Sequence, residues 1–221
     1  QAHYPIVYPA LLALIWLVWP AYPDNLGLMR LLSEMASGLG ILVAYAYFVR
    51  SGLTTRGLAL LAVAMTAFHP YRVIQATIVY SEMVYTLLSF AALYAVARWD
   101  EESKGIWDLR RAVWAAASLA GVALAPLTRY LGAALVAGGV FHFALRRAWG
   151  KSAATLIVSA AVFAPWWLWV TLSGGSPYLT RFATGTAPLK MATSLADVLV
   201  YAVPNQILYL LPYSANSRIE Q

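Results

Sequence analysis

The chain has 221 residues, of which 62% are hydrophobic and only 11% are charged, and its mean hydropathy is +0.67. A soluble domain of this size could not bury so much apolar surface in one core, so the composition predicts a polytopic membrane protein. The net charge of +6 comes from basic residues that lie between apolar segments. Because that pattern sets membrane topology, we exclude nucleic acid as a partner.

The first apolar segment predicts a helix over residues 5–20 that lies on the membrane surface. It is too short to cross a bilayer, which takes roughly 20 apolar residues. Aromatic residues along it are typical of the membrane–water interface. These aromatic residues are Tyr4, Tyr8, Trp16, Trp19 and Tyr22. No basic region precedes the segment, so we expect no signal peptide.

Six further apolar segments predict membrane crossings. Their approximate ranges are 26–49, 57–69, 73–99, 111–126, 130–146 and 152–172. The third is longer than an upright crossing requires, so we expect its first part, up to Tyr80, to follow the interface before the chain descends near Ser81. Pro126 interrupts the long apolar run of residues 112–145, because proline removes a helical hydrogen bond, and two short crossings are expected there.

Residues 173–221 are expected to form an extracytoplasmic segment after this membrane core of residues 1–172. Ser173–Pro177 has the composition of a loop. Farther along, residues 195–211 predict either another crossing or an interfacial helix. The predicted fold is therefore all-α, a polytopic transmembrane helical bundle.

Basic residues occupy alternate connections between the predicted crossings. They are Arg50, Arg56, Arg98, Lys104, Arg110, Arg111, Arg146, Arg147 and Lys151. By the positive-inside rule these connections are cytoplasmic. The turns at 69–72 and around Arg129 then lie on the non-cytoplasmic side of what we expect to be the plasma membrane.

Two charged residues within apolar segments are the first candidates for chemistry. An ionised side chain inside a bilayer costs several kcal/mol, ~2.5–3.5 on insertion scales, unless it faces a partner or a polar cavity. Arg129 could bind an oxyanion such as phosphate through a bidentate contact, or else it reaches water or pairs with Glu82. Glu82 could accept a proton, orient a sugar hydroxyl or hold a metal, or else it pairs with Arg129 or Arg72.

Other polar residues give weaker signals. His69 in an outer turn and His3 beside Tyr4 could bind a metal, but a single histidine without a second ligand fits a structural turn better. We therefore expect no metal site in this sequence, although a requirement for a divalent cation stays open. Residues 100–102 are expected to lie in a solvated cytoplasmic loop. Glycine-rich phosphate loops are absent, which argues against nucleotide-bound donors.

The order of several short motifs resembles the polytopic C-type (GT-C) glycosyltransferases, in particular the protein mannosyltransferase and aminoarabinose transferase branch. The resemblance covers nearly the whole chain. The matching pieces are His3–Pro9, Met29–Ser33, Ser81–Met83, Leu127–Gly132 and Pro165–Trp166.

The resemblance implies transfer of a sugar from a polyprenyl-phosphate donor in the membrane lipid to an acceptor on the non-cytoplasmic face, which is a protein, lipid or glycan. In that family an acidic residue at the place of Glu82 lines the active site, and a cation at the place of Arg129 contacts the carrier phosphate. We place Thr128, Tyr130 and Arg72 beside Arg129 in this candidate phosphate site. The family's principal acidic motif precedes the position where this chain begins, so we expect an incomplete membrane core.

Two other classes of function remain open. A non-catalytic, lipid-binding membrane scaffold subunit would need no acidic motif. A secondary transporter would fit the short crossings, but such proteins are commonly built from repeated halves, and this chain shows no internal repeat.

Overall fold

The computed structural model describes residues 5–101 and 109–173. Regular structure in these ranges is entirely helical, which confirms the predicted all-α class. The helices are α1 (Val7–Val18), α2 (Leu26–Arg50), α3 (Arg56–Ala67), α4 (Pro70–Ala76), α5 (Ser81–Glu101), α6 (Leu109–Thr128), α7 (Gly132–Leu145) and α8 (Trp149–Leu172).

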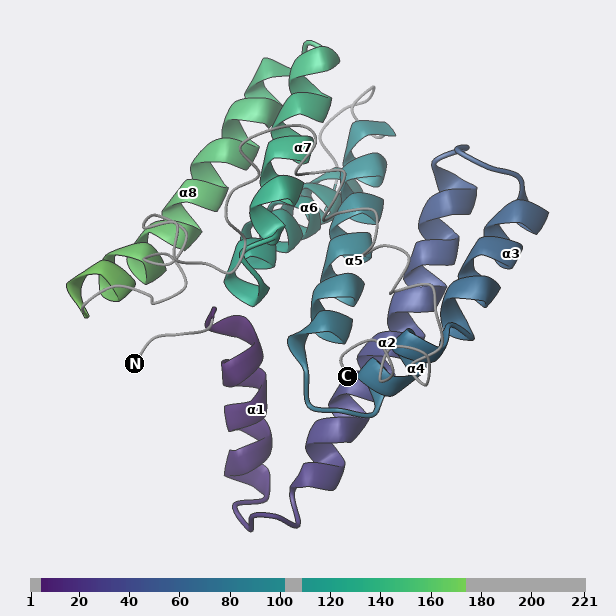
Figure 1. Ribbon diagram of the computed structural model, residues 1–221. Coiled ribbons are helices and arrows are strands. Elements are labelled where there is room, and N and C mark those ends of the chain that lie inside the picture. Colours follow the sequence, from purple (N-terminus) through teal and green to yellow (C-terminus); the bar gives the residue numbers. More distant parts are fainter. Residues whose placement is uncertain (1–4, 102–108, 174–221) are drawn as a thin grey trace, which may run out of the picture.

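Helix α5 forms the centre of the bundle. It packs against α2 on one side and against α6 on the other, and α7 and α8 cover α6 (Figure 1). Helix α3 lies outside α2, while α1 and the short α4 lie at one end. Helices α2, α5 and α6 therefore form the core against which the other described helices pack.

Small residues allow α5 and α6 to approach closely. A Cβ atom added at Gly121 of α6 would lie 2.9 Å from the Cβ of Ala92 in α5. Beside this contact the Trp99 and Phe143 rings meet edge to face, with centroids 5.0 Å apart. Close packing at small residues is a general way of joining helices in membranes, where lipid competes with apolar side chains.

Three described helices are long and apolar enough to cross a membrane, namely α2, α6 and α8. Helices α3 and α4 give a fourth candidate if the pair, bent by 63°, counts as one span. Helices α1 and α7 are shorter apolar helices. The structure thus supports an integral membrane protein with three or four candidate spans, fewer than the six crossings expected from the sequence.

Two segments differ in detail from the expected ranges. The segment expected at 73–99 is divided near the expected position: Pro70 starts the separate helix α4, and α5 begins at Ser81, where the chain was expected to descend. Pro126 lies inside α6 instead of ending it. The helical bonding continues past the proline, since the Arg129 N–H donates to the Ala125 carbonyl at 3.0 Å. The break between α6 and α7 therefore falls at residues 129–131.

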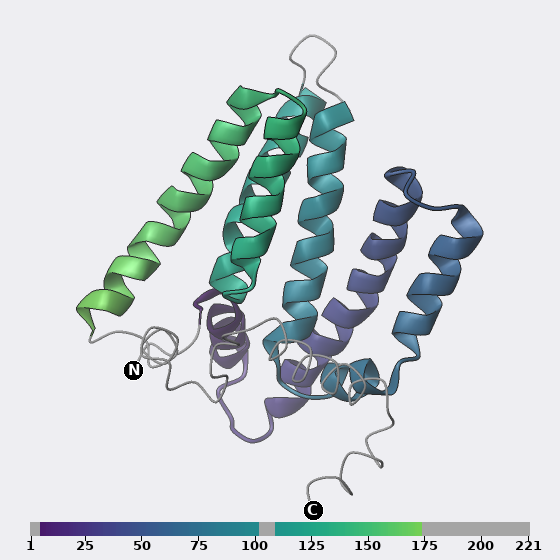
Figure 2. The same cartoon turned by 45° about the horizontal axis from the view of Figure 1, so that its top comes forward.

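The two ends of the bundle differ in charge. The α2–α3 turn, the last turn of α5, the start of α6 and the α7–α8 turn lie together at one end, which we call the basic end (Figure 2). Helix α4, the start of α5 and the α6–α7 turn lie at the opposite end.

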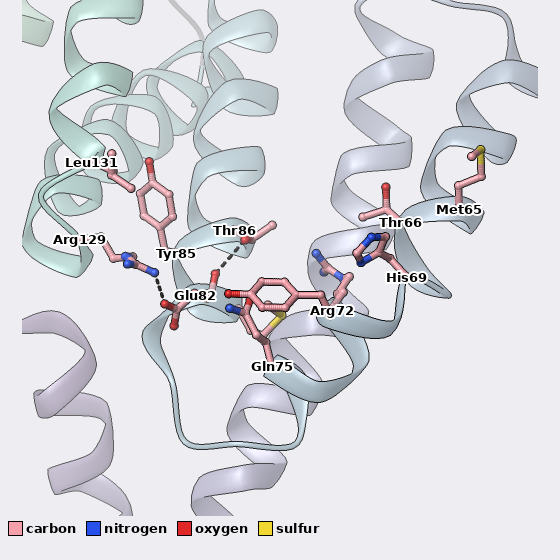
Figure 3. Close-up of a pocket in the computed structure, with 12 residues that line it drawn as sticks. Met65, Thr66, His69, Arg72, Gln75, Glu82, Tyr85, Thr86, Arg129 and Leu131 are labelled. Carbon is pink, nitrogen blue, oxygen red and sulfur yellow. Dashed lines mark hydrogen bonds and ion pairs between the residues drawn. The ribbon is translucent and has the colours of Figure 1, made fainter. Parts of the chain in front are cut away.

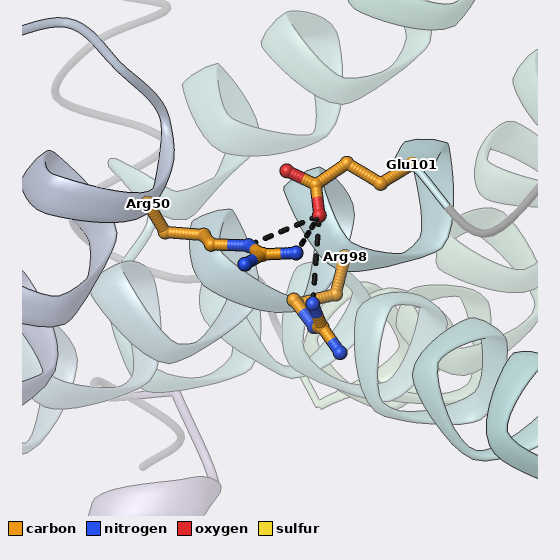
Figure 4. A network of polar contacts seen from close by, with 3 residues as sticks. All are labelled: Arg50, Arg98 and Glu101. Atoms are coloured by element: carbon orange, nitrogen blue, oxygen red, sulfur yellow. Dashed lines mark hydrogen bonds and ion pairs between the residues drawn. The ribbon is translucent and has the colours of Figure 1, made fainter.

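Acidic residues at the basic end are held by cations, most of them from outside α5. Glu101 accepts a hydrogen bond from Arg50 Nη2 at 2.6 Å, and Arg98 Nη1 lies 3.5 Å away (Figure 4). Asp100 lies 2.8 Å from Arg146 Nη1 and 3.8 Å from Lys151 Nζ. The expected solvated loop is therefore wrong for residues 100 and 101, which form the last turn of α5 and tie it to its neighbours.

Candidate functional site

A cavity of about 500 Å³ opens at the end opposite the basic end, between α3, α4, α5 and the α6–α7 turn (Figure 3). The following residues line it: Met65, Thr66, His69, Tyr71, Arg72, Gln75, Glu82, Met83, Tyr85, Thr86, Arg129 and Leu131. Four of the residues proposed from the sequence, His69, Arg72, Glu82 and Arg129, thus share one cavity.

Glu82 and Arg129 form an ion pair across this cavity (Figure 3). Glu82 lies in the first turn of α5, and Arg129 directly follows the last residue of α6. Their side chains are 25% and 33% exposed, so neither is fully withdrawn from the cavity. The structure therefore contains the ion pair that the sequence left open as one explanation for both residues.

The ion pair leaves polar capacity unused on both partners. The Oε2 atom of Glu82 is buried and has no hydrogen-bond partner within the described ranges. A guanidinium group carries five N–H donors, and the contact of Arg129 Nη1 with Glu82 Oε1 is its only ion pair in the described part of the chain. An anion that enters the cavity would find donors on Arg129.

Arg72 brings a second cation to the cavity from α4. Its Nη2 donates to the Ser37 carbonyl of α2 at 3.0 Å. Its Nε is buried and lacks a partner among the described residues. Gly40 of α2 faces this guanidinium, because an added Cβ there would lie 3.6 Å from Nη2. The backbone contact to α2 holds Arg72 in place and leaves one N–H unpaired.

His69 lines the cavity from the N-cap position of α4, where its backbone is extended. No group of three histidine or acidic side chains that could hold a metal occurs in residues 5–101 and 109–173. The cavity therefore offers binding by arginine and proton transfer by a carboxylate or an imidazole.

Several residues proposed from the sequence do not join this group. Thr128 is almost fully buried, and its Oγ1 donates to the Leu124 carbonyl at 3.0 Å, a bond within its own helix. Tyr130 is not among the described residues that line the cavity. His3 and Tyr4 lie outside the described residues. We therefore place the candidate site on Arg72, Glu82 and Arg129.

Other lining residues were missed by sequence reasoning, although helical spacing offers a signal for them. Tyr85 and Thr86 follow Glu82 by three and four positions on α5, and Gln75 follows Arg72 by three on α4. Residues at such spacing share a helix face. Projecting each helix from its charged residue would have indicated these neighbours.

Tyr8 connects α1 to the start of α5 beside the site. It packs with Met83 and Val84 at the start of α5, and its hydroxyl lies 3.5 Å from Ser33 Oγ. Burial raises the pKa of the Tyr8 phenol, the Ser33 contact opposes this rise, and the nearby Glu82 charge adds to it. Tyr8 therefore stays a neutral hydrogen-bonding group beside the cavity.

We compared the chain with known families, curated proteins and solved structures. No family model, curated protein or solved structure matched it.

Proposed function

We propose that this chain is the membrane core of a glycosyltransferase that moves a sugar from a polyprenyl-phosphate donor to an acceptor on the non-cytoplasmic face. The observation that supports this most is the cavity in which Glu82, Arg129 and Arg72 converge from three separate segments. A carboxylate beside two arginines provides both a proton acceptor and binding groups for a phosphate.

The proposed sidedness depends on the position of the cavity. It lies at the end opposite the basic end, and basic connections face the cytoplasm in most membrane proteins. The six expected crossings, including the short α7, belong to this proposal. A donor whose lipid lies in the outer leaflet would reach the cavity from the side.

The ion pair suggests an order of events. The donor phosphate takes two N–H groups of Arg129 and displaces the Glu82 carboxylate from them. Glu82 then accepts the proton of the acceptor hydroxyl while the oxygen of that hydroxyl bonds to the anomeric carbon. The bond from that carbon to the phosphate oxygen breaks with both electrons going to oxygen, and Arg129 and Arg72 stabilise the polyprenyl phosphate that leaves.

Binding to the purified protein tests the first step. The affinity for a polyprenyl phosphate is compared with that for the matching polyprenol, which lacks the anion. We expect the wild type to prefer the phosphate, Arg129→Ala to lose about 2–5 kcal/mol of that binding, and Arg129→Lys to keep part of it.

Arg56→Ala is the matched control, because Arg56 is an exposed arginine at the basic end. It should bind the phosphate like the wild type. Equal binding of phosphate and alcohol by the wild type, or unchanged phosphate binding by Arg129→Ala, would contradict the proposal.

A non-catalytic lipid-binding subunit is the second candidate. Glu82 is the sole carboxylate among the described lining residues, and it already pairs with Arg129. Such a subunit would bind the polyprenyl phosphate with the same dependence on Arg129. It would release no sugar from a labelled polyprenyl-phosphate donor, whereas the enzyme would.

A further inference from the structure

A second cavity, of about 410 Å³, lies at the basic end. Five described residues line it: Arg98, Leu109, Arg110, Val113 and Trp114. Arg98 comes from the end of α5, and the others come from the first two turns of α6. The lining therefore combines two guanidinium groups with apolar side chains and contains no described carboxylate.

Arg110 is the less constrained of the two cations. It is exposed, and no carboxylate within residues 5–101 and 109–173 pairs with it. By contrast, Arg50 and Arg98 both contact Glu101 in the ionic network of Figure 4, and Arg50 lies closer to it than Arg98 does. An anion in this cavity would meet a guanidinium that no carboxylate of the described residues pairs with.

Arg98 is fixed in position beside the cavity. Its Cζ lies 5.2 Å from the centre of the Trp114 ring, a cation–π distance. The contact with the Trp114 ring restricts the Arg98 guanidinium, which therefore has a defined position at the cavity. Two cations from different helices can thus contact one phosphate group.

The apolar part of the cavity indicates its depth in the membrane. Leu109 is 81% exposed and Val113 is also exposed. Both lie in α6, which is a candidate span that begins at Leu109. Arginines at the very end of a span beside exposed aliphatic side chains and a tryptophan are typical of the headgroup level of a bilayer.

We propose that this second cavity binds the phosphate of an anionic phospholipid from the leaflet at the basic end. Arg98 and Arg110 contact the phosphate, and an acyl chain lies along Leu109 and Val113. Basic pockets between transmembrane helices bind anionic headgroups in the same way. The site is separate from the polyprenyl-phosphate cavity, which lies at the other end of α5.

Lipid binding by the purified full chain tests this proposal. Native mass spectrometry counts the bound lipid after titration with phosphatidylglycerol or with phosphatidylcholine of the same acyl chains. We expect the wild type to retain phosphatidylglycerol preferentially. Arg110→Gln should weaken that binding at least fivefold, and Arg98→Gln should weaken it as well.

Arg147→Gln is the matched control, since Arg147 is an exposed arginine of the α7–α8 turn at the same end and lies outside the cavity lining. It removes the same charge and should change binding less than twofold. Equal weakening by Arg147→Gln would reveal a general charge effect and overturn the proposal. So would equal retention of both lipids by the wild type.

Competition with inorganic phosphate separates a lipid site from a site for a soluble phosphate. The lipid proposal expects millimolar phosphate to leave bound phosphatidylglycerol in place, because the aliphatic contacts hold only the lipid. Displacement by phosphate, with phosphate binding lost in Arg110→Gln, would overturn it in favour of a soluble ligand. Unfolding midpoints of all variants are measured first, and Arg110→Gln is expected to match the wild type because Arg110 has no described ion pair.

Discussion

The two ends of the bundle differ in how their charged side chains are paired. At the basic end, Glu101 lies near two arginines, and Asp100 contacts Lys151 of α8 and Arg146 of the turn between α7 and α8. At the other end, within the described part of the chain, Glu82 pairs with Arg129 beside a cavity of about 500 Å³, and Glu82 Oε2 is buried without a hydrogen-bond partner.

This difference separates ion pairs that join helices from groups that are available for a ligand. Cations in excess around a carboxylate satisfy its oxygens and fix the helix ends. A carboxylate and a guanidinium that satisfy only each other, beside open volume, can exchange partners. Unpaired buried polar groups are expensive in a folded protein, so Glu82 Oε2 and Arg72 Nε beside the open volume indicate a place for a ligand.

The largest expected effect is on sidedness. Gly150 and Ser173 are exposed at opposite ends of α8, and the chain contains no cysteine that would react in the background. In intact cells Gly150→Cys should be shielded from an impermeant thiol reagent and Ser173→Cys should be labelled, because the proposed orientation places the basic end in the cytoplasm. The reverse pattern, or labelling of both, would refute the assignment of the two ends.

A change at Glu82 tests whether the ion pair at the cavity is catalytic. Glu82→Gln should lower turnover from a polyprenyl-phosphate sugar by about a hundredfold or more, since it removes the proton acceptor. Glu101→Gln changes an acid on the same helix at the basic end and should leave turnover near the wild-type rate. A drop in folded protein with unchanged specific activity would show instead that Glu82 only stabilises the fold.

A change at Gly132 tests how rigidly the α6–α7 turn holds Arg129. A Cβ at Gly132 would clash with the Ala125 carbonyl carbon, so Gly132→Ala must displace backbone. The loss of unfolding free energy should reach the upper part of the ~1–3 kcal/mol that is typical of overpacking. Gly138→Ala, in the same helix with open space around it, should not lower the unfolding midpoint in detergent. Equal midpoints for both variants would show that the turn yields easily.

The smallest expected effect compares two adjacent acids at the basic end. The Glu101 side chain is 41% exposed, so Glu101→Gln should lose only about 0.2–1 kcal/mol, and less at high salt. The Asp100 side chain is 13% exposed, so Asp100→Asn should lose more, about 1–3 kcal/mol. Unfolding in detergent at two salt concentrations measures both. A larger loss for Glu101→Gln would reverse our view of which acid joins the helices.

Sequence reasoning anticipated the helical class and the approximate helix ranges because apolar run length and proline positions are local properties. It also brought Glu82 and Arg129 together as possible partners, because isolated charges in apolar runs need one. Their position on a shared cavity with Arg72 depends on the packing of α4 against α2 and α5, which no local pattern specifies.

Asp100 shows where the method failed. Its sequence neighbours are charged, which suggested a solvated loop, but its partners His142, Arg146 and Lys151 come from a region about 40 or more residues later. Thr128 failed for a different reason. Its motif suggested a ligand contact, whereas a hydroxyl near a helix end can bond to the preceding turn. Both errors concern which way a side chain faces, a tertiary property.

Helix α5 carries Glu82 in its first turn and Asp100 and Glu101 in its last, about 27 Å apart along a helix with a 1.5 Å rise per residue. It therefore connects the cavity to the ionic contacts of the basic end, and it packs closely against α6 where Ala92 meets Gly121. A shift of α5 along its axis would alter the ionic contacts at both of its ends simultaneously. Thermodynamic reciprocity then requires that a ligand at one end which favours one position of α5 also shifts affinity at the other end by the same factor.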